Sequence, residues 1–177
     1  MDLETLRLRL RPLQVTDYDA HYAVIDSDPA VTWLGVARTP EEARTYVAAK
    51  AGLWNGRAFG PCAVIEKATG AFLGHGGLEP LDETGEVQLS YYLGRPAWGQ
   101  GYATELGWAA LDFGFRSLGL RRIAAIVRPR NAASRRVLEK LGFRHERDGH
   151  FSGAEAQYWA LLPSSQEPFT YPKGASP

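Results

Sequence analysis

The chain has 177 residues, a length typical of one domain that buries about two-thirds of the surface of its unfolded chain. Its 20 Lys and Arg residues balance its 20 Asp and Glu residues, so its summed charge gives no general attraction to nucleic acid or to a membrane. The single Cys62 excludes an internal disulfide framework, and no apolar run approaches the ~20 residues of a membrane span. We expect one domain over residues 1–163 and a loosely packed C-terminal tail over 164–177.

The N-terminal half is predicted to contain strands and helices with clear boundary signals. Alternating leucine and arginine indicates a half-buried strand over residues 6–12. Thr16 is a candidate N-cap for a helix that runs to about Asp26. A capping box at Thr39, followed by proline at the first helical position, predicts a helix over 40–51. Alternation and turn signals predict further strands over 62–67, 71–78 and 87–93.

After residue 87 the predicted strands and helices alternate. A glycine-rich loop opens a helix whose apolar residues recur at helical spacing, and Gly119 ends that helix. The last predicted elements are a strand over 123–127, a helix over 132–141, and strands over 144–150 and 157–162. This order favours a mixed sheet covered by helices. The N-terminus lacks the basic start and apolar core of a secretion signal, so we expect a cytoplasmic protein.

The most informative segment is the loop before the predicted helix. Gly99, Gly101 and Ala103 leave a bare backbone that leads directly into a helix-forming run. Glycines let successive amides turn inward, and the helix start adds unpaired N–H groups and a dipole worth ~0.3–1 kcal/mol per favourable charge. The loop would therefore hold a diphosphate. By itself, the same pattern also fits a tight strand-to-helix connection.

A second segment, Asn131–Phe143, combines an Asn-x-x-Ser pattern with Leu-Gly-Phe, and it follows the strand predicted over 123–127. Two further stretches, Thr5–Pro12 and Gly74–Leu78, match the same family. With the glycine loop, these segments make residues 5–162 similar to the GNAT superfamily of acyl-CoA N-acyltransferases. Within that superfamily, the chain resembles the ribosomal-protein alanine acetyltransferase-like branch.

The resemblance implies an α/β (α+β) fold, with a mixed, mostly antiparallel central sheet of about seven strands covered by about four helices. It also implies direct transfer of an acetyl group from acetyl-CoA to a primary amine. The loop from Trp98 to Ala103 would bind the coenzyme diphosphate through backbone amides. Trp98 stands where many relatives carry Gln or Arg, so its backbone contact is expected to remain but a polar contact from its side chain is not. The residues expected to bind the coenzyme are Tyr91, Leu93, Trp98, Gly99, Gln100, Gly101, Tyr102, Ala103, Thr104 and Asn131.

Two residues of the second segment are candidates for catalysis. Ser134 shares a helical face with Leu138 that points to the protein interior, where a hydroxyl needs a partner. Many GNAT enzymes place a tyrosine at the position of Leu138 to protonate the leaving thiolate, and the resemblance within the branch passes that role to Ser134. A hydroxyl bonded back to the preceding helical turn is the structural alternative. Asn131 is expected to cap the helix and, by the resemblance, to contact the pantetheine arm.

Two carboxylates are candidates for the general base. Glu86 precedes the strand that faces the cofactor, and Glu79 follows Leu78. Either also fits a solvent-exposed carboxylate at a strand end. Glu105, which follows the glycine loop, is expected to brace the start of the helix.

Other reactive residues predict no further chemistry. Cys62 fits a buried strand residue better than a nucleophile, and the sequence contains no Gly-x-Ser-x-Gly elbow. The histidines show no metal-ligand spacing, so no metal is expected. These histidines are His21, His75, His145 and His150.

The acceptor can be bounded by proton arithmetic. A lysine amine near pKa 10.4 is ~2.5 units harder to deprotonate than an α-amine near 7.7–8.0, a difference of about 3.4 kcal/mol. Without an obvious strong base, an N-terminal α-amine of a protein or peptide is the favoured acceptor. A polyamine, an aminoglycoside or an amino-acid derivative stays open, as does a non-catalytic acyl-CoA-binding module. The protein is expected to be a monomer or homodimer. The aromatic side chains that could line a substrate cleft, or else pack in the core, are Trp33, Trp54, Tyr91 and Tyr92.

Overall fold

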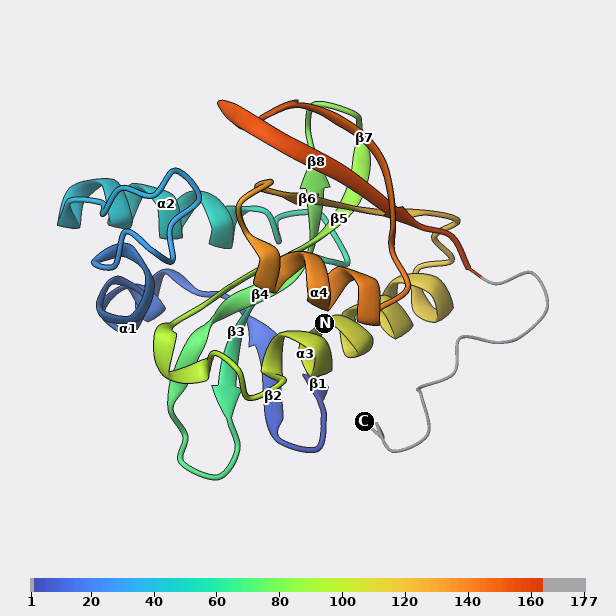
Figure 1. Cartoon of the computed structure of the whole chain (residues 1–177). Coiled ribbons are helices and arrows are strands. Elements are labelled where there is room, and N and C mark those ends of the chain that lie inside the picture. The colour runs from blue at the N-terminus through green and yellow to red at the C-terminus, as the bar shows by residue number, and fades with distance from the viewer. Residues whose placement is uncertain (1, 164–177) are drawn as a thin grey trace.

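A twisted eight-stranded sheet runs through the protein in the order β1-β2-β3-β4-β5-β6-β8-β7 (Figure 1). The structure is a computed structural model and describes residues 2–163. All neighbouring strands are antiparallel except β5 and β6, which are parallel. This mixed, mostly antiparallel sheet with four α-helices confirms the predicted fold class. The predicted tail over 164–177 lies outside the described residues.

The strands are β1 (Leu3–Glu4), β2 (Leu8–Pro12), β3 (Pro61–Glu66), β4 (Phe72–Leu81), β5 (Glu86–Leu93), β6 (Ile123–Val127), β7 (Arg144–Phe151) and β8 (Ala154–Leu161). The α-helices are α1 (Tyr18–His21), α2 (Pro40–Gly52), α3 (Tyr102–Asp112) and α4 (Ala132–Lys140). A π-helical turn, Tyr22–Asp26, extends α1, and a second one, Phe113–Ser117, extends α3.

The first predicted strand begins two residues too early. Leu8 and Leu10 are fully buried in β2, but Leu6 is 71% exposed and lies in the turn between β1 and β2. Thr5 closes this turn, because its N–H donates to the carbonyl of Leu8 and its hydroxyl accepts the N–H of Leu8, both at 2.9 Å. Alternation alone predicted a longer strand because it carries no information about a side chain that closes a turn.

The helix predicted to begin after Thr16 has a different cap. The chain turns first through a 3-10 segment, Val15–Asp17. The carboxylate of Asp17 accepts the N–H of Gln14 at 2.8 Å and pairs with Arg11 at 2.5 Å. Asp17 thus occupies the N-cap position of α1 in place of Thr16, but its carboxylate makes no capping hydrogen bond to that helix.

Other local predictions are confirmed. Thr39 and Glu42 form the capping box of α2, with the Thr39 N–H 2.8 Å from Glu42 Oε2 and the Glu42 N–H 3.3 Å from Thr39 Oγ1. Strand β6 has the predicted bounds. The N-terminus of α2 is thus fixed by its own sequence, as expected for a capping box.

Helices α1 and α2 cover one face of the sheet, and α3 and α4 cover the other (Figure 1). On β4, His75 contacts His21 of α1, whereas Leu78 belongs to the apolar core on the side of α3. On β5, the hydroxyl of Tyr91 reaches Ser134 of α4. Because successive strand residues point to opposite faces, neighbouring residues of β5 serve the two sides of the sheet.

Strands β5 and β6 pair at only one register, with Gln88 opposite Ala124. From that point β5 continues to Leu93 and β6 to Val127 without further pairing between them. Their facing backbone groups beyond this register are therefore left for a ligand or for water.

Candidate active site

The glycine loop between β5 and α3 has the backbone geometry of an anion site. Gly99 and Gly101 have φ angles of +74° and +83°, in the left-handed region that strains other residues. Gly101 is the N-cap of α3, and its carbonyl accepts the N–H groups of Thr104 and Glu105 at 3.1 and 3.0 Å. The first N–H groups of a helix lack partners within it, so this end of α3 attracts a negative charge. The loop fits a diphosphate.

A clamp from the N-terminus holds this loop in place. Glu105 accepts hydrogen bonds from the Thr5 hydroxyl at 2.6 Å, from the N–H of Arg7 at 2.8 Å and from Arg7 Nε at 2.7 Å. Arg7 also donates to the carbonyl of Gln100 at 2.9 Å and lies over the ring of Tyr102. Burial acts to raise the pKa of Glu105, but the hydrogen bonds outweigh it, and the pKa is lowered. The brace expected of Glu105 is present and extends to the β1–β2 turn.

Trp98 fixes the start of the loop to the end of β5. Its indole Nε1 donates to the carbonyl of Leu93 at 2.6 Å, and the guanidinium of Arg95 lies 5.7 Å from its ring. The side chain therefore has a structural use that its position in the motif did not predict. As a result, the segment predicted to bind the coenzyme runs without a break from β5 into the first turn of α3.

The start of α4 lies beside β5, as the predicted site requires. Asn131 Oδ1 accepts the N–H of Ser134 at 3.0 Å, which confirms that Asn131 caps the helix. The hydroxyl of Tyr91 lies 3.4 Å from the carbonyl of Ser134. Burial raises the pKa of Tyr91 to about 12, so this hydroxyl stays protonated at neutral pH. The structure thus brings together three of the predicted residues.

The hydroxyl of Ser134 is available to a ligand. Within residues 2–163, the hydrogen bonds of Ser134 use its backbone, and its Oγ has no protein partner. The alternative of a bond back to the preceding turn is therefore not seen. Leu138, one turn further along α4, is 2% exposed and contributes only packing.

The two candidate bases have different environments. Glu79 is 3% exposed in β4 and pairs with Lys50 at 2.5 Å, so the interpretation as an exposed strand-end carboxylate is wrong for it. Glu86 begins β5, where it accepts the Tyr158 hydroxyl at 2.6 Å and Arg122 Nε at 3.0 Å. Partial burial acts to raise the pKa of Glu86, but these partners lower it. Glu86 lies five residues from Tyr91 along an extended strand, about 16 Å. Its role as the base stays a prediction.

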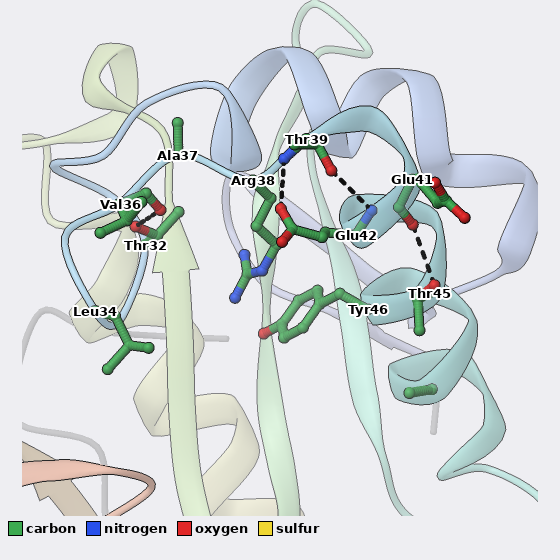
Figure 2. A pocket seen from close by; sticks show the side chains of 11 residues that line it. Thr32, Leu34, Val36, Ala37, Arg38, Thr39, Glu41, Glu42, Thr45 and Tyr46 are labelled. Carbon is green, nitrogen blue, oxygen red and sulfur yellow. Dashed lines mark hydrogen bonds between the residues drawn. The ribbon is translucent and has the colours of Figure 1, made fainter.

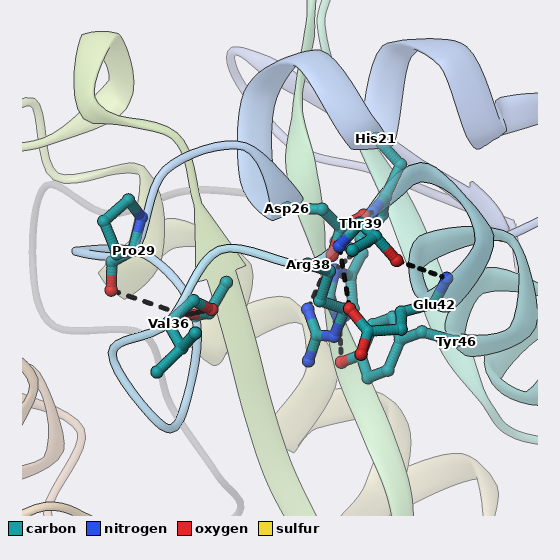
Figure 3. Close-up of polar contacts among 10 residues, drawn as sticks. His21, Asp26, Pro29, Val36, Arg38, Thr39, Glu42 and Tyr46 are labelled. Atoms are coloured by element: carbon teal, nitrogen blue, oxygen red, sulfur yellow. Dashed lines mark hydrogen bonds and ion pairs between the residues drawn. The ribbon is translucent and has the colours of Figure 1, made fainter.

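A buried chain of hydrogen-bonded polar side chains beneath α1 and α2 was missed by sequence reasoning, and Figure 3 labels three of its members, Tyr46, His21 and Asp26. His75 Nε2 lies 3.3 Å from the Tyr46 hydroxyl, and His75 Nδ1 lies 2.9 Å from His21 Nε2. His21 Nδ1 in turn lies 2.6 Å from Asp26, which pairs with Arg38 at 2.5 Å. His21, Asp26 and His75 are fully buried. The capping and spacing signals of the sequence do not reveal these contacts, because α1, α2 and β4 are far apart along the chain.

The Tyr46 end of these hydrogen-bonded side chains lies at a pocket that we call the α2 pocket (Figure 2). The α2 pocket has a volume of ≈ 840 Å³, within the ~300–1,000 Å³ usual for small-ligand sites. Tyr46 lines it, and the Arg38 guanidinium lies 3.8 Å from the centroid of the Tyr46 ring. Glu41 and Glu42 line it from α2, and apolar side chains such as Leu34 line it from the preceding segment. The glycine loop lies outside it.

Other chemistry finds little support in the described part of the chain. Cys62 is fully buried in β3, and burial raises its pKa to about 12, so its thiol stays protonated. Among residues 2–163, no cluster of His, Cys, Asp and Glu could hold a metal ion. No helix in that range is long and apolar enough to cross a membrane.

Comparisons with known proteins agree with this geometry. An N-acetyltransferase of Bacillus licheniformis called p20, described as uncharacterized, is 34% identical over 148 residues, which cover 81% of this chain and 83% of that protein. A crystal structure of an acetyltransferase from Agrobacterium tumefaciens matches with a TM-score of 0.79 and 26% identity, over 91% of this chain and 94% of that one.

A further solved structure comes from a more distant enzyme. The ribosomal-protein-S5-alanine acetyltransferase of Vibrio fischeri matches with a TM-score of 0.69 and 18% identity, over 95% of this chain and 100% of that one, which is a likeness of fold alone. Residues 7–144 match the acetyltransferase (GNAT) domain family. This match spans β2, the glycine loop and α4. The chain therefore belongs to the GNAT family and is an acyl-CoA-dependent acetyltransferase.

Proposed function

We propose that the protein transfers an acetyl group from acetyl-CoA to a primary amine, and that its favoured acceptor is the α-amine of a peptide or protein N-terminus. The observation that carries the choice of donor is the left-handed Gly99 and Gly101 backbone at the start of α3. A diphosphate bound there lets the pantetheine arm extend along β5, where β5 and β6 have stopped pairing.

The coenzyme contacts follow from this placement. Backbone N–H groups between Trp98 and Thr104 bind the diphosphate, helped by the positive end of the α3 dipole. The backbone of Tyr91 and Leu93 and the side chain of Asn131 bind the pantetheine arm. Acetyl-CoA supplies the activated thioester, and these residues hold that thioester in reach of an amine.

The transfer itself needs no enzyme nucleophile. The neutral amine attacks the thioester carbonyl, the N–C bond forms and the C–S bond breaks. Two protons leave an ammonium nitrogen in the full reaction, one ending on sulfur and one in solvent. The hydroxyl of Ser134, which has no partner within residues 2–163, donates a proton to the thiolate and receives one of the nitrogen protons in return.

The α-amine is favoured because it is easier to deprotonate than a lysine amine by ~2.5 pKa units. Glu86, the predicted base, is already engaged by Tyr158 and Arg122. The fold likeness to a ribosomal-protein alanine acetyltransferase agrees with this choice but carries no substrate information at 18% identity. We place the chain in that branch on the sequence motifs alone.

An acceptor panel tests the proposal. The purified protein is mixed with acetyl-CoA and a peptide with a free N-terminus and no lysine, or with the same peptide blocked at its terminus and carrying one lysine. We expect thiol release and a single acetyl group, located by mass spectrometry, with the free terminus only. Efficient acetylation of the blocked peptide would contradict the α-amine assignment.

The volume of the α2 pocket favours one second candidate, a small-molecule amine. The same assay therefore includes a polyamine, an aminoglycoside and an amino-acid derivative. A turnover much faster with one of these than with either peptide would replace the peptide acceptor and leave the acetyltransferase assignment standing.

A further inference from the structure

Four hydrogen-bonded side chains, from Tyr46 through His75 and His21 to Asp26, take no part in the transfer described above. Their contacts nevertheless restrict which atoms carry the hydrogens. Asp26 is an ion-paired carboxylate, so His21 Nδ1 must carry a hydrogen and donate to it. If His21 is neutral, its Nε2 accepts from His75 Nδ1–H, and His75 Nε2 then accepts from the Tyr46 hydroxyl. All the contacts are satisfied by neutral rings.

One other pattern also satisfies every contact. If His21 carries a second hydrogen, its Nε2–H donates to His75 Nδ1, and His75 Nε2–H donates to the Tyr46 oxygen. The two patterns differ by one proton. A proton added at the Tyr46 end would place its charge on His21, beside the carboxylate of Asp26. His75 is neutral in both patterns and only exchanges the nitrogen that bears its hydrogen.

The charges around the chain favour this arrangement. Burial, together with His21, Lys50 and Arg38, lowers the pKa of His75 well below its usual range. Lys50 is paired with Glu79 and lies 5.6 Å from the centroid of the Tyr46 ring. The ring of Tyr92 stacks on His75 at 5.0 Å and closes its other side. A positive charge is thus held off His75.

Tyr46, the outer end of these hydrogen-bonded side chains, lies at a pocket that an acceptor could enter. Tyr46 lines the α2 pocket, on the face of the sheet opposite α3 and α4. His75 faces Tyr92, whose neighbour Tyr91 lies on the face of β5 that meets α4. The hydroxyl of Tyr46 is thus joined through His75 to the face of β5 opposite α4, and direct transfer brings the amine to the coenzyme at β5.

We propose that Tyr46 accepts the proton of the acceptor ammonium and that His75 relays a proton from Tyr46 to His21. This inference rests on the acetyltransferase function proposed above. The ammonium gives one proton to the Tyr46 oxygen while the original Tyr46 hydrogen moves to His75 Nε2. At the same time, the Nδ1 hydrogen of His75 moves to His21 Nε2.

The protons balance over the whole reaction. The amine lone pair is freed, the N–C bond forms, and the second nitrogen proton is the equivalent of the one that ends on the thiol. The relayed proton leaves by the reverse path through Tyr46 when the product departs. In this scheme Tyr46 contacts the acceptor, whereas His75, His21 and Asp26 act through Tyr46.

The first test uses Tyr46→Phe, which keeps the ring against Arg38 and removes the hydroxyl. With saturating acetyl-CoA and a peptide α-amine, we expect kcat of the variant to fall about tenfold or more at pH 7. The loss should shrink to about threefold or less at pH 9, where the α-amine is already mostly neutral. A purely structural role of the hydroxyl would lower kcat equally at both pH values and would overturn the proposal.

Tyr18→Phe is the matched control. Tyr18 of α1 also has an arginine over its ring, Arg44 at 4.6 Å, but its hydroxyl is not part of the chain. We expect its kcat to match that of the wild type at both pH values. If Tyr46→Phe behaves in the same way, the relay is overturned while the acetyltransferase stands. A wild-type protein that acetylates no amine overturns the proposed function instead.

A second test is independent of turnover. In ¹⁵N NMR spectra of the whole protein, His75 should carry its hydrogen on Nδ1 when His21 is neutral. On acidification the His75 ring should stay uncharged, because burial and the neighbouring charges lower its pKa. Tyr46→Phe should shift the resonance of His75 Nε2. A His75 that bears its hydrogen on Nε2 while His21 is neutral, or a His75 ring that becomes charged on mild acidification, contradicts the relay.

Discussion

Arg7 and Glu105 join the N-terminal turn to the first turn of α3 through two hydrogen bonds, one from the backbone N–H and one from the side chain of Arg7. Arg7 also donates to the carbonyl of Gln100 inside the glycine loop. The shape of the predicted anion site therefore depends on a residue pair outside the motif that identifies it.

Replacing Glu105 by glutamine should loosen this clamp. We expect Glu105→Gln to lower the free energy of unfolding by ~1–2 kcal/mol at pH 7 and to weaken acetyl-CoA binding several-fold. Chemical denaturation and isothermal titration calorimetry measure the two effects. The control is Glu146→Gln, which removes the ion pair between Glu146 of the edge strand β7 and Arg122. It should leave acetyl-CoA affinity unchanged.

The same pair gives a pH dependence whose sign is fixed. The folded-state pKa of Glu105 is lowered, so its contribution is present above the unfolded-state pKa and is lost as the pH falls through the folded-state pKa. The stability difference between wild type and Glu105→Gln should therefore be largest above about pH 5 and should shrink on acidification below about pH 4. A difference that grows on acidification would show that Glu105 stabilises the fold in another way.

Gly101→Val should block the diphosphate. Gly101 has a φ of +83°, and a Cβ there would lie 3.5 Å from the guanidinium of Arg7 at the mouth of the loop. We expect acetyl-CoA affinity to fall by at least about tenfold, equivalent to ~1.4 kcal/mol. Gly56→Val, at a φ of +71° with open space around it, controls for backbone strain. Equal affinities in two cooperatively folded variants would remove the loop from the coenzyme site.

Ser134→Ala should affect chemistry and leave binding alone. The Oγ of Ser134 has no protein partner within residues 2–163, so its loss leaves no buried group unsatisfied. If Ser134 donates the proton to the thiolate, we expect kcat to fall about 10²-fold with unchanged acetyl-CoA affinity. The control is Ser117→Ala, an exposed serine in the turn after α3. Near-normal kcat with a verified acceptor would make the Ser134 hydroxyl dispensable.

Signals within a few residues of each other predicted most of the fold. The capping box of Thr39 and Glu42 set the start of α2, and Asn131 set the start of α4. The glycines of the loop predicted both the turn and the helix that follows. These features depend on one turn of backbone, so a single sequence carries them. Leu6 and Thr16 were misplaced because other local contacts, the turn closed by Thr5 and the bond of Asp17 to Gln14, overrode equally plausible local patterns.

The polar chain could not be predicted in the same way. His21 and His75 meet because α1 packs on β4, and a π-helical turn places Asp26 against His21. The spacing of these residues in the sequence does not distinguish His21 and His75 from the other histidines. The burial of Glu79 was missed for a related reason, since its partner Lys50 comes from α2 on the far side of a loop.

The single register between β5 and β6 bears on how the protein folds. Strands β3, β4 and β5 follow one another in sequence and pair in that order, and β7 pairs with β8 as a hairpin, so each of these two groups can form from local chain segments. Joining Gln88 to Ala124 requires the crossover through α3 to close, and joining Leu8 to Glu66 requires the longer segment with α1 and α2 to close, so both pairings carry a loop entropy. The junction of β5 with β6 is held at one paired position only, so its backbone amides should exchange with solvent more readily than those of the strands on either side.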